Sequence, residues 1–214
     1  MKLQSLVLAA ATALTMTTAF AVPAGTWSVA AGAHYVDPKS DNGTLNNGLS
    51  VDVDGDVRPT ISGEYFIANN VGVELLAAIP FHHDFNLNNP DGTTALTGKT
   101  QHLPPTLSLQ YHFDGYNLPM NVKPFVGVGV NYTTFFKEKI YSDAFEKLEL
   151  DDSVGVAGHI GLDIPFAPTE YFRIDARYMD IKTDASVKAN GETIDLGEVD
   201  ISPWVYGVAF VKTF

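Results

Sequence analysis

The sequence contains no cysteine, which excludes a disulfide framework and thiol chemistry. Basic residues are scarce, because 13 Lys and Arg stand against 25 Asp and Glu and the formal net charge is −12. This acidic balance argues against nucleic acid as a partner. Beyond its first residues, the chain also lacks any stretch that approaches the roughly 18 uncharged apolar residues of a membrane helix. A helical membrane protein is therefore excluded.

The N-terminal residues 1–21 have the pattern of a secretory signal peptide. Lys2 supplies a positive charge, Leu6 to Leu14 form an apolar segment, and Ala19-Phe20-Ala21 is a small-residue cleavage site. We expect cleavage after Ala21. The remaining residues, 22–214, have a length that suits one domain.

The C-terminal segment from Pro203 to Phe214 alternates large and small side chains. In a strand, one face would carry Trp204, Tyr206, Val208, Phe210 and Phe214. Because the chain carries a leader and any membrane span must be made of strands, this pattern predicts a β-barrel in the outer membrane of a Gram-negative bacterium.

Similar strand patterns recur along the chain. They cover residues 25–36, 57–67, 71–81, 101–113, 122–136, 153–164, 171–183 and 201–214. Short connections alternate with long ones of about 16–20 residues, as in outer-membrane barrels. We therefore expect an all-β, eight-stranded antiparallel transmembrane β-barrel over 22–214, with short turns and both termini in the periplasm. The Asn190-Gly191 turn predicts that the last two strands continue beyond the membrane as a ribbon.

Because alternate residues of a strand point to opposite faces, each expected strand has one face toward lipid and one toward the lumen. None of the residues assigned to the lipid faces is charged. Phe81 and Gly158 belong to this face. Two aromatic girdles are expected, an outer one of Tyr35, Tyr132, Tyr178, Trp204 and Tyr206 and an inner one of Trp27, Tyr65, Tyr111, Phe113 and Phe214.

The periplasmic half of the lumen is expected to be charged. Its inward residues, which we call the plug, are Glu64, Glu74, Lys123, Asp163, Arg173, Asp175 and Arg177, joined by Gln110 and His112. An eight-stranded barrel has room for side chains or one small ligand, so these charges must pair closely. A packed polar core is the main interpretation, with a proton or ion relay as the alternative. Either would close the periplasmic end.

The extracellular half of the lumen is expected to be apolar. Its inward residues, the predicted vestibule, are Pro80, Pro104, Phe135, Met179, Ile181, Ile201 and Pro203, with Arg58, His34 and His102 as polar exceptions. Apolar loop residues Leu45, Leu49, Val51 and Val53 would roof it. Such a vestibule suits a hydrophobic solute, which would leave sideways above the plug. Prolines that remove ladder donors would supply the exit, or would simply end strands or tune curvature.

Two further groups of residues give weaker evidence for a binding site. His82-His83-Asp84 with His102 could hold a transition metal or serve a hydrolase at the rim, but it lacks fixed ligand spacing and is interpreted as a solvated loop. The Asp52–Asp56 run does not match a calcium-loop spacing. We therefore expect no metal, no cofactor and no enzyme. Residues 139–150 are expected to form a short helix.

Several segments resemble the outer membrane protein W (OmpW) family. They are Val73–Ala78, His102–Tyr111, Val126–Phe136, Leu150–Ser153 and Pro203–Tyr206. The resemblance implies an eight-stranded barrel with a narrow, largely apolar channel that passes small hydrophobic molecules across the outer membrane. Its partners would be outer-membrane lipid, small hydrophobic solutes and the barrel assembly machinery, which would read the C-terminal strand ending in Phe214. Lys212 departs from the aromatic residue that is usual two positions before the terminal Phe.

A different class of function remains open. A receptor or structural barrel would act through its long acidic loops, within Asp37–Asp56 and Lys137–Asp152, and its lumen would be inert filling.

Overall fold

The computed structural model describes residues 21–114 and 118–214. Apart from Ala21, the expected signal peptide lies outside these residues. Within the described ranges, no helix is long and apolar enough to cross a membrane.

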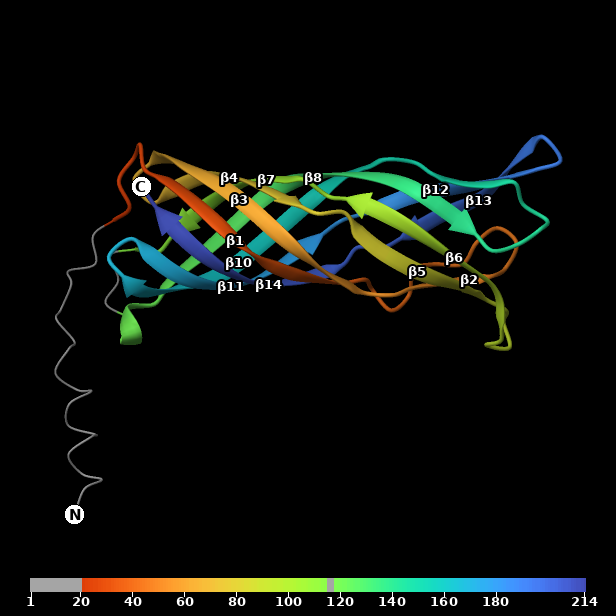
Figure 1. The fold of residues 1–214 in the computed structure, drawn as a ribbon, viewed down its shortest axis with the longest axis horizontal. Helices are drawn as coiled ribbons and strands as arrows, with labels where there is room; N and C mark the ends of the chain where they lie inside the picture. Colours follow the sequence, from red (N-terminus) through yellow and green to blue (C-terminus); the bar gives the residue numbers. More distant parts are fainter. Residues whose placement is uncertain (1–20, 115–117) are drawn as a thin grey trace, which may run out of the picture.

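Among the described residues, eight antiparallel strands close into a barrel (Figure 1). They are β1 (Trp27–Asp37), β3 (Asp56–Ala68), β4 (Val71–Ala78), β7 (Thr106–His112), β8 (Lys123–Ile140), β10 (Ser153–Ala167), β11 (Glu170–Met179) and β14 (Trp204–Thr213). Each pairs with its neighbour along the chain order, and β14 pairs with β1 to close the wall. The predicted fold class is confirmed.

The outward side chains of these strands form a continuous apolar band. Val128 and Val154, for example, are 68% and 70% exposed. Exposed aromatic residues lie near both ends of the strands, including Tyr132 and Trp204 at one end and Trp27 and Phe172 at the other. An apolar surface of this kind is stable only against lipid.

Both ends of the described chain lie at the same end of the barrel, which we call the terminal end. The Asn70 N–H donates to the Val22 carbonyl at 3.0 Å, and the Phe214 N–H donates to the Trp27 carbonyl at 2.8 Å. The opposite end, the loop end, carries the longer connections (Figure 1).

At the loop end, six further strands extend the wall beyond the lipid band. They are β2 (Ser50–Val53), β5 (Phe81–Asn88), β6 (Thr94–Leu103), β9 (Lys147–Leu150), β12 (Lys182–Ala189) and β13 (Glu192–Asp200). β12 and β13 pair up to Ala189 and Glu192. Between them, Asn190 and Gly191 have φ values of 51° and 79°, as a tight hairpin turn requires. The predicted ribbon is confirmed.

The short helix expected over 139–150 is wrong. β8 continues to Ile140, and Lys147–Leu150 is the strand β9, which pairs with β12. Leu148 lies opposite Val187, and both side chains are buried. The edge of the β12–β13 ribbon offers partners for the backbone of this segment, so tertiary pairing outweighs its helix propensity.

Several strands expected to be continuous are divided. Ile79 and Pro80 separate β4 from β5, Pro104 and Pro105 separate β6 from β7, and Pro203 precedes β14. Proline lacks the N–H that a ladder needs, so pairing stops at these points.

Phe81 illustrates the consequence of such a break. It was expected on the lipid face, but it is 2% exposed and points into the lumen, whereas Ile79 is 55% exposed. The chain bends at Pro80, so the alternation of β5 is out of phase with that of β4.

Candidate channel and polar plug

The lumen is polar toward the terminal end. Arg173 lies directly opposite Asp163 in the β10–β11 register. Its Nε and Nη2 donate to the two carboxylate oxygens at 2.7 and 2.8 Å. The guanidinium also stacks 4.3 Å from the ring centroid of Phe125. Such a two-pronged pair holds both charges in fixed positions.

Glu74 is the second centre of the network. Its carboxylate accepts from Arg177 Nη2 at 2.8 Å and from Gln110 Nε2 at 2.7 Å, and Arg173 Nη1 lies 3.5 Å away. The side chain of Glu74 is completely inaccessible to solvent. Burial without these donors would be very unfavourable, so the network offsets the cost of burying this carboxylate.

Histidines complete the plug. Asp175 Oδ2 lies 3.2 Å from His34 Nε2, 3.1 Å from His159 Nε2 and 3.3 Å from Arg177 Nε. Glu64 lies 2.8 Å from His112 Nε2. These contacts come from strands all around the wall, so the side chains bridge the lumen.

The structure places all seven plug residues of the sequence prediction on the lumen side. Six are buried, and Lys123 is half-buried near the mouth at the terminal end. Lys123 Nζ lies 3.3 Å from Asp114. Asp114 lies just beyond the expected strand 101–113. His34 was expected in the vestibule, whereas it contacts Asp175 of the plug.

Above the plug lies a small lower cavity, with about 340 Å³ of space between atoms when the part open to solvent is included. Four predicted vestibule residues line it: Pro104, Met179, Ile181 and Pro203. The other lining residues are His34, Val36, Thr60, Leu76, Ala78, Phe81, His102 and Val205. The lining is mostly aliphatic, which favours an apolar occupant.

An upper cavity at the loop end encloses about 580 Å³, including the part open to solvent. Its lining includes Ile201 of the predicted vestibule and Leu45, Val51 and Val53 of the predicted roof. Most of the remainder comes from segments that sequence reasoning treated as loops, namely Phe85, Leu87, Ile140, Leu148, Leu150, Ala185, Leu196 and Val199. His83, Thr100, His102 and Thr183 are its polar members.

The last two predicted vestibule residues, Phe135 and Pro80, are not among the residues that line the two cavities. Phe135 is 7% exposed, and its ring centroid is 5.9 Å from that of His102. Pro80 is half-buried and lines neither cavity.

The His82-His83-Asp84 run does not form a cluster. These residues alternate along β5, so His83 is buried inside the wall whereas His82 and Asp84 are exposed on its outer surface. Within the described ranges, no group of three or more His, Asp or Glu side chains could hold a metal ion.

The wall is interrupted beside the lower cavity. Pairing between β4 and β7 ends at Leu76 and Thr106. It resumes between β5 and β6 at Phe81 and His102. We call the interval, residues 77–80 facing 103–105, the seam. Ala78 and Pro104, one from each side, line the lower cavity.

The seam is local, because each side remains bonded to its other neighbour. The Ile79 N–H donates to the Pro59 carbonyl, and the Tyr132 N–H donates to the Pro105 carbonyl, both at 3.1 Å. A strand break is therefore tolerated here without opening the rest of the wall.

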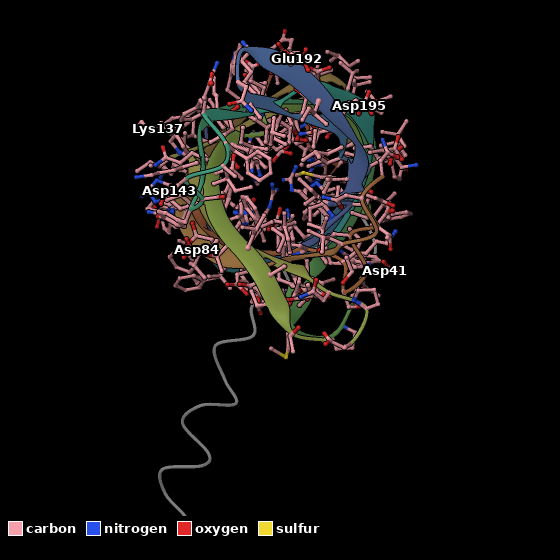
Figure 2. All side chains as sticks on the ribbon, turned by 90° about the vertical axis from the view of Figure 1, so that its right-hand side faces the viewer. Asp41, Asp84, Lys137, Asp143, Glu192 and Asp195 are labelled. Carbon is pink, nitrogen blue, oxygen red and sulfur yellow. The ribbon has the colours of Figure 1, made fainter. Side chains whose placement is uncertain are left out.

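The rim of the loop end is strongly acidic. Figure 2 looks onto this end, where Asp41, Asp84, Asp143, Glu192 and Asp195 lie around the rim and Lys137 is the one labelled base. The rim therefore repels anionic solutes at low ionic strength.

Together, a lipid-facing apolar band, a closed eight-stranded wall and a lumen filled with paired charges define an integral barrel protein of the bacterial outer membrane. The sequence model of the OmpW family matches residues 18–214. The chain belongs to the OmpW family, and its location is the outer membrane.

Individual relatives support the assignment to this family. Outer membrane protein W of Vibrio cholerae is 33% identical over 94% of each chain. Outer membrane protein AlkL of Ectopseudomonas oleovorans is 27% identical over 86% of this chain and 76% of that protein. The dibenzothiophene metabolism operon protein PahQ of Pseudomonas aeruginosa is 37% identical over 42% of this chain and 40% of that protein. The crystal structure of OprG from Pseudomonas aeruginosa superposes with a TM-score of 0.77 and 34% identity, covering 91% and 98% of the two chains.

Proposed function

We propose that the protein passes small hydrophobic molecules into the outer membrane. The observation that carries the proposal is the sequence of environments along the lumen, in which two apolar cavities end on a buried network of ion pairs. An apolar solute gains free energy by leaving water for such cavities, at roughly 25 cal/mol per Å² buried. A hydrated ion gains nothing there and meets the plug.

The exit that we propose is lateral. The plug blocks a straight path, and the seam lies beside the lower cavity at the edge of the lipid band, where Ile79 is 55% exposed. A solute in the lower cavity would pass between Ala78 and Pro104 into the bilayer. The name of PahQ, which refers to dibenzothiophene metabolism, supports apolar fused-ring aromatic molecules as one substrate class.

The proposed orientation follows the general rule that short turns of outer-membrane barrels face the periplasm. The terminal end, with both termini, is then periplasmic and the loop end is extracellular. We further propose that the assembly machinery reads β14, whose outward residues include Trp204, Tyr206 and Phe210. No catalytic activity is assigned to the chain.

The test is uptake of an apolar solute, such as naphthalene, by cells with matched barrel abundance. Met179→Asp and Phe135→Asp place a carboxylate in the apolar part of the lumen and should lower uptake. Lys182→Asp, at an exposed position on β12, is the matched control. Unchanged uptake in both lumen variants would refute the channel and favour a receptor that acts through the acidic rim.

A further inference from the structure

The upper cavity contains two buried histidines in a lining that is apolar apart from them and two threonines. His83 and His102 are 2% and 1% exposed, and both line this cavity. We propose that they form a recognition site for a hydroxyl group, so that the cavity selects apolar molecules that carry a hydroxyl. This inference rests on the proposed function and names a substrate class within it.

The two imidazoles are held in place by stacking. They project inward from β5 and β6, with ring centroids 4.7 Å apart and planes 7° from parallel. Phe81 stacks on His102 at 5.5 Å, and Phe135 packs against the same ring at 5.9 Å. The planes of the two rings are therefore set before any ligand enters.

A hydrogen bond determines the tautomer of His83. Its Nδ1 lies 2.5 Å from the backbone carbonyl oxygen of Asp54. A carbonyl only accepts, so Nδ1 carries the hydrogen and Nε2 of the neutral ring is left as an acceptor. Within the described chain, Nε2 has no hydrogen-bond partner.

His102 offers the complementary group. Neither of its ring nitrogens has a hydrogen-bond partner among the described residues. A neutral imidazole carries one N–H and one lone pair, so His102 supplies a donor as well as an acceptor. Burial lowers the pKa of both rings, and each lies beyond the lipid band, so both are neutral at pH 7.

The other polar side chains of the lining are already engaged. The Thr183 hydroxyl donates to the Asp151 carbonyl at 2.7 Å, and the Thr100 hydroxyl donates to the Gln101 carbonyl at 3.5 Å. Among the described side chains of the lining, the atoms that lack any hydrogen-bond partner are therefore ring nitrogens of the two histidines.

A hydroxyl is the small neutral group that matches this arrangement. It can donate to His83 Nε2 and accept from the N–H of His102, while the apolar body of the ligand contacts residues such as Leu148 and Val199. A pure hydrocarbon would leave the buried nitrogens unpaired, which is unfavourable. Because His102 also lines the lower cavity, the site lies where the two cavities meet.

The experiment compares 1-naphthol with naphthalene, which share the same apolar body. The full chain in lipid nanodiscs is dialysed to equilibrium against each probe, and empty nanodiscs correct for partition into lipid. We expect naphthol to bind about tenfold more tightly than naphthalene, which corresponds to about 1.4 kcal/mol from the added hydrogen bonds. 1-Methoxynaphthalene, which cannot donate, should lose most of this preference.

Two variants test whether the preference for naphthol over naphthalene depends on His102 and His83. His102→Phe keeps the ring stack and removes no side-chain hydrogen bond found among the described residues, so it should fold and bring the ratio of naphthol to naphthalene affinity close to one. His83→Phe should do the same, although it also removes the bond to Asp54. His82→Gln, on the outer surface of β5, is the matched control and should keep the preference.

The outcomes separate the two proposals. If naphthalene binds but naphthol binds no better, the hydroxyl site is refuted and the channel stands. If neither probe binds, both proposals fail. If the naphthol preference persists in His102→Phe and His83→Phe, the histidines are not the site. Tight binding of Zn²⁺ alone that depends on both histidines, without a naphthol preference, would identify a metal site instead.

Discussion

Arg173 and Asp163 face each other across β11 and β10 and form two hydrogen bonds, of 2.7 and 2.8 Å, inside the lumen. The side chains are 3% and 7% exposed. Because the same guanidinium reaches Glu74, one residue neutralises carboxylates on opposite sides of the plug.

Arg173→Ala should therefore destabilise the barrel by about 3–5 kcal/mol, since it leaves buried carboxylates unpaired. Urea unfolding in lipid, followed by the heat-modifiable gel shift, measures the loss. Lys212→Ala is the control, because the Lys212–Glu170 pair is about one-third exposed and worth about 1 kcal/mol or less. Equal stability of Arg173→Ala and the parent chain would show that the plug does not hold the barrel together.

Gly158→Arg should impair assembly. Gly158 is exposed on the lipid face of β10, and an added Cβ would meet no atom within 4 Å. An arginine near the middle of the bilayer costs about 2–4 kcal/mol in such barrels. The yield of folded barrel in membranes is the measurement, and Gly158→Leu, large but apolar, should assemble normally. Normal yield of the arginine variant would mean that this position does not face lipid.

Neighbouring alanines provide a test of the seam. Ala78 lines the lower cavity, whereas Ala77 is exposed on the outer face. Ala78→Trp should fill the space beside Pro104 and reduce naphthalene uptake several-fold, while Ala77→Trp places the same ring in lipid and should leave uptake unchanged. Equal uptake by the two variants, at equal abundance, would argue against a lateral exit at the seam.

Naphthol binding should weaken in acid. Burial holds the pKa of His83 and His102 below the ordinary value of 6.5. The charged groups near His83 are Asp56, which opposes this shift, and Arg58, which favours it with His82. Above pH 6.5 both rings are neutral and affinity should be constant.

As the pH falls through the lowered pKa values, His83 Nε2 gains a proton and can no longer accept from a hydroxyl. Dialysis between about pH 8 and about pH 5 measures the change. Naphthalene, which makes no hydrogen bond, serves as the reference ligand. A naphthol preference that is unchanged at a pH low enough to protonate His83 would contradict the assignment of the neutral acceptor.

Much of the barrel could be predicted from the sequence because lipid and lumen impose opposite demands on alternate residues. In β8, Val126, Val128 and Val130 all face lipid, and the residues between them cannot. The same two-residue period identified Glu74, Arg173 and the other charges of the plug as inward.

The partners within the plug could not be predicted. Asp175 meets His34 although 141 residues separate them, and the contact exists only because β14 closes the barrel against β1 and β11. Alternation assigns a side chain to a face, but it does not say which strand lies across the lumen.

The upper cavity was missed for a different reason. Phe81, His83, Phe85 and Leu87 alternate with polar residues, which is a strand signal. His83 was instead grouped with His82 and Asp84, its neighbours in the chain, as part of a loop. Adjacent residues of a strand point to opposite faces, so His83 cannot share a site with His82 and Asp84 once β5 forms.

The plug also bears on the permeability of the cell envelope. A lumen crossed by Arg173, Arg177 and their carboxylate partners is narrower than the wide lumen of a porin. Adding copies of this protein should therefore leave the membrane resistant to hydrophilic antibiotics and osmotic shock. If the plug closes the lumen as we propose, cells can carry the protein in abundance and still keep their permeability barrier.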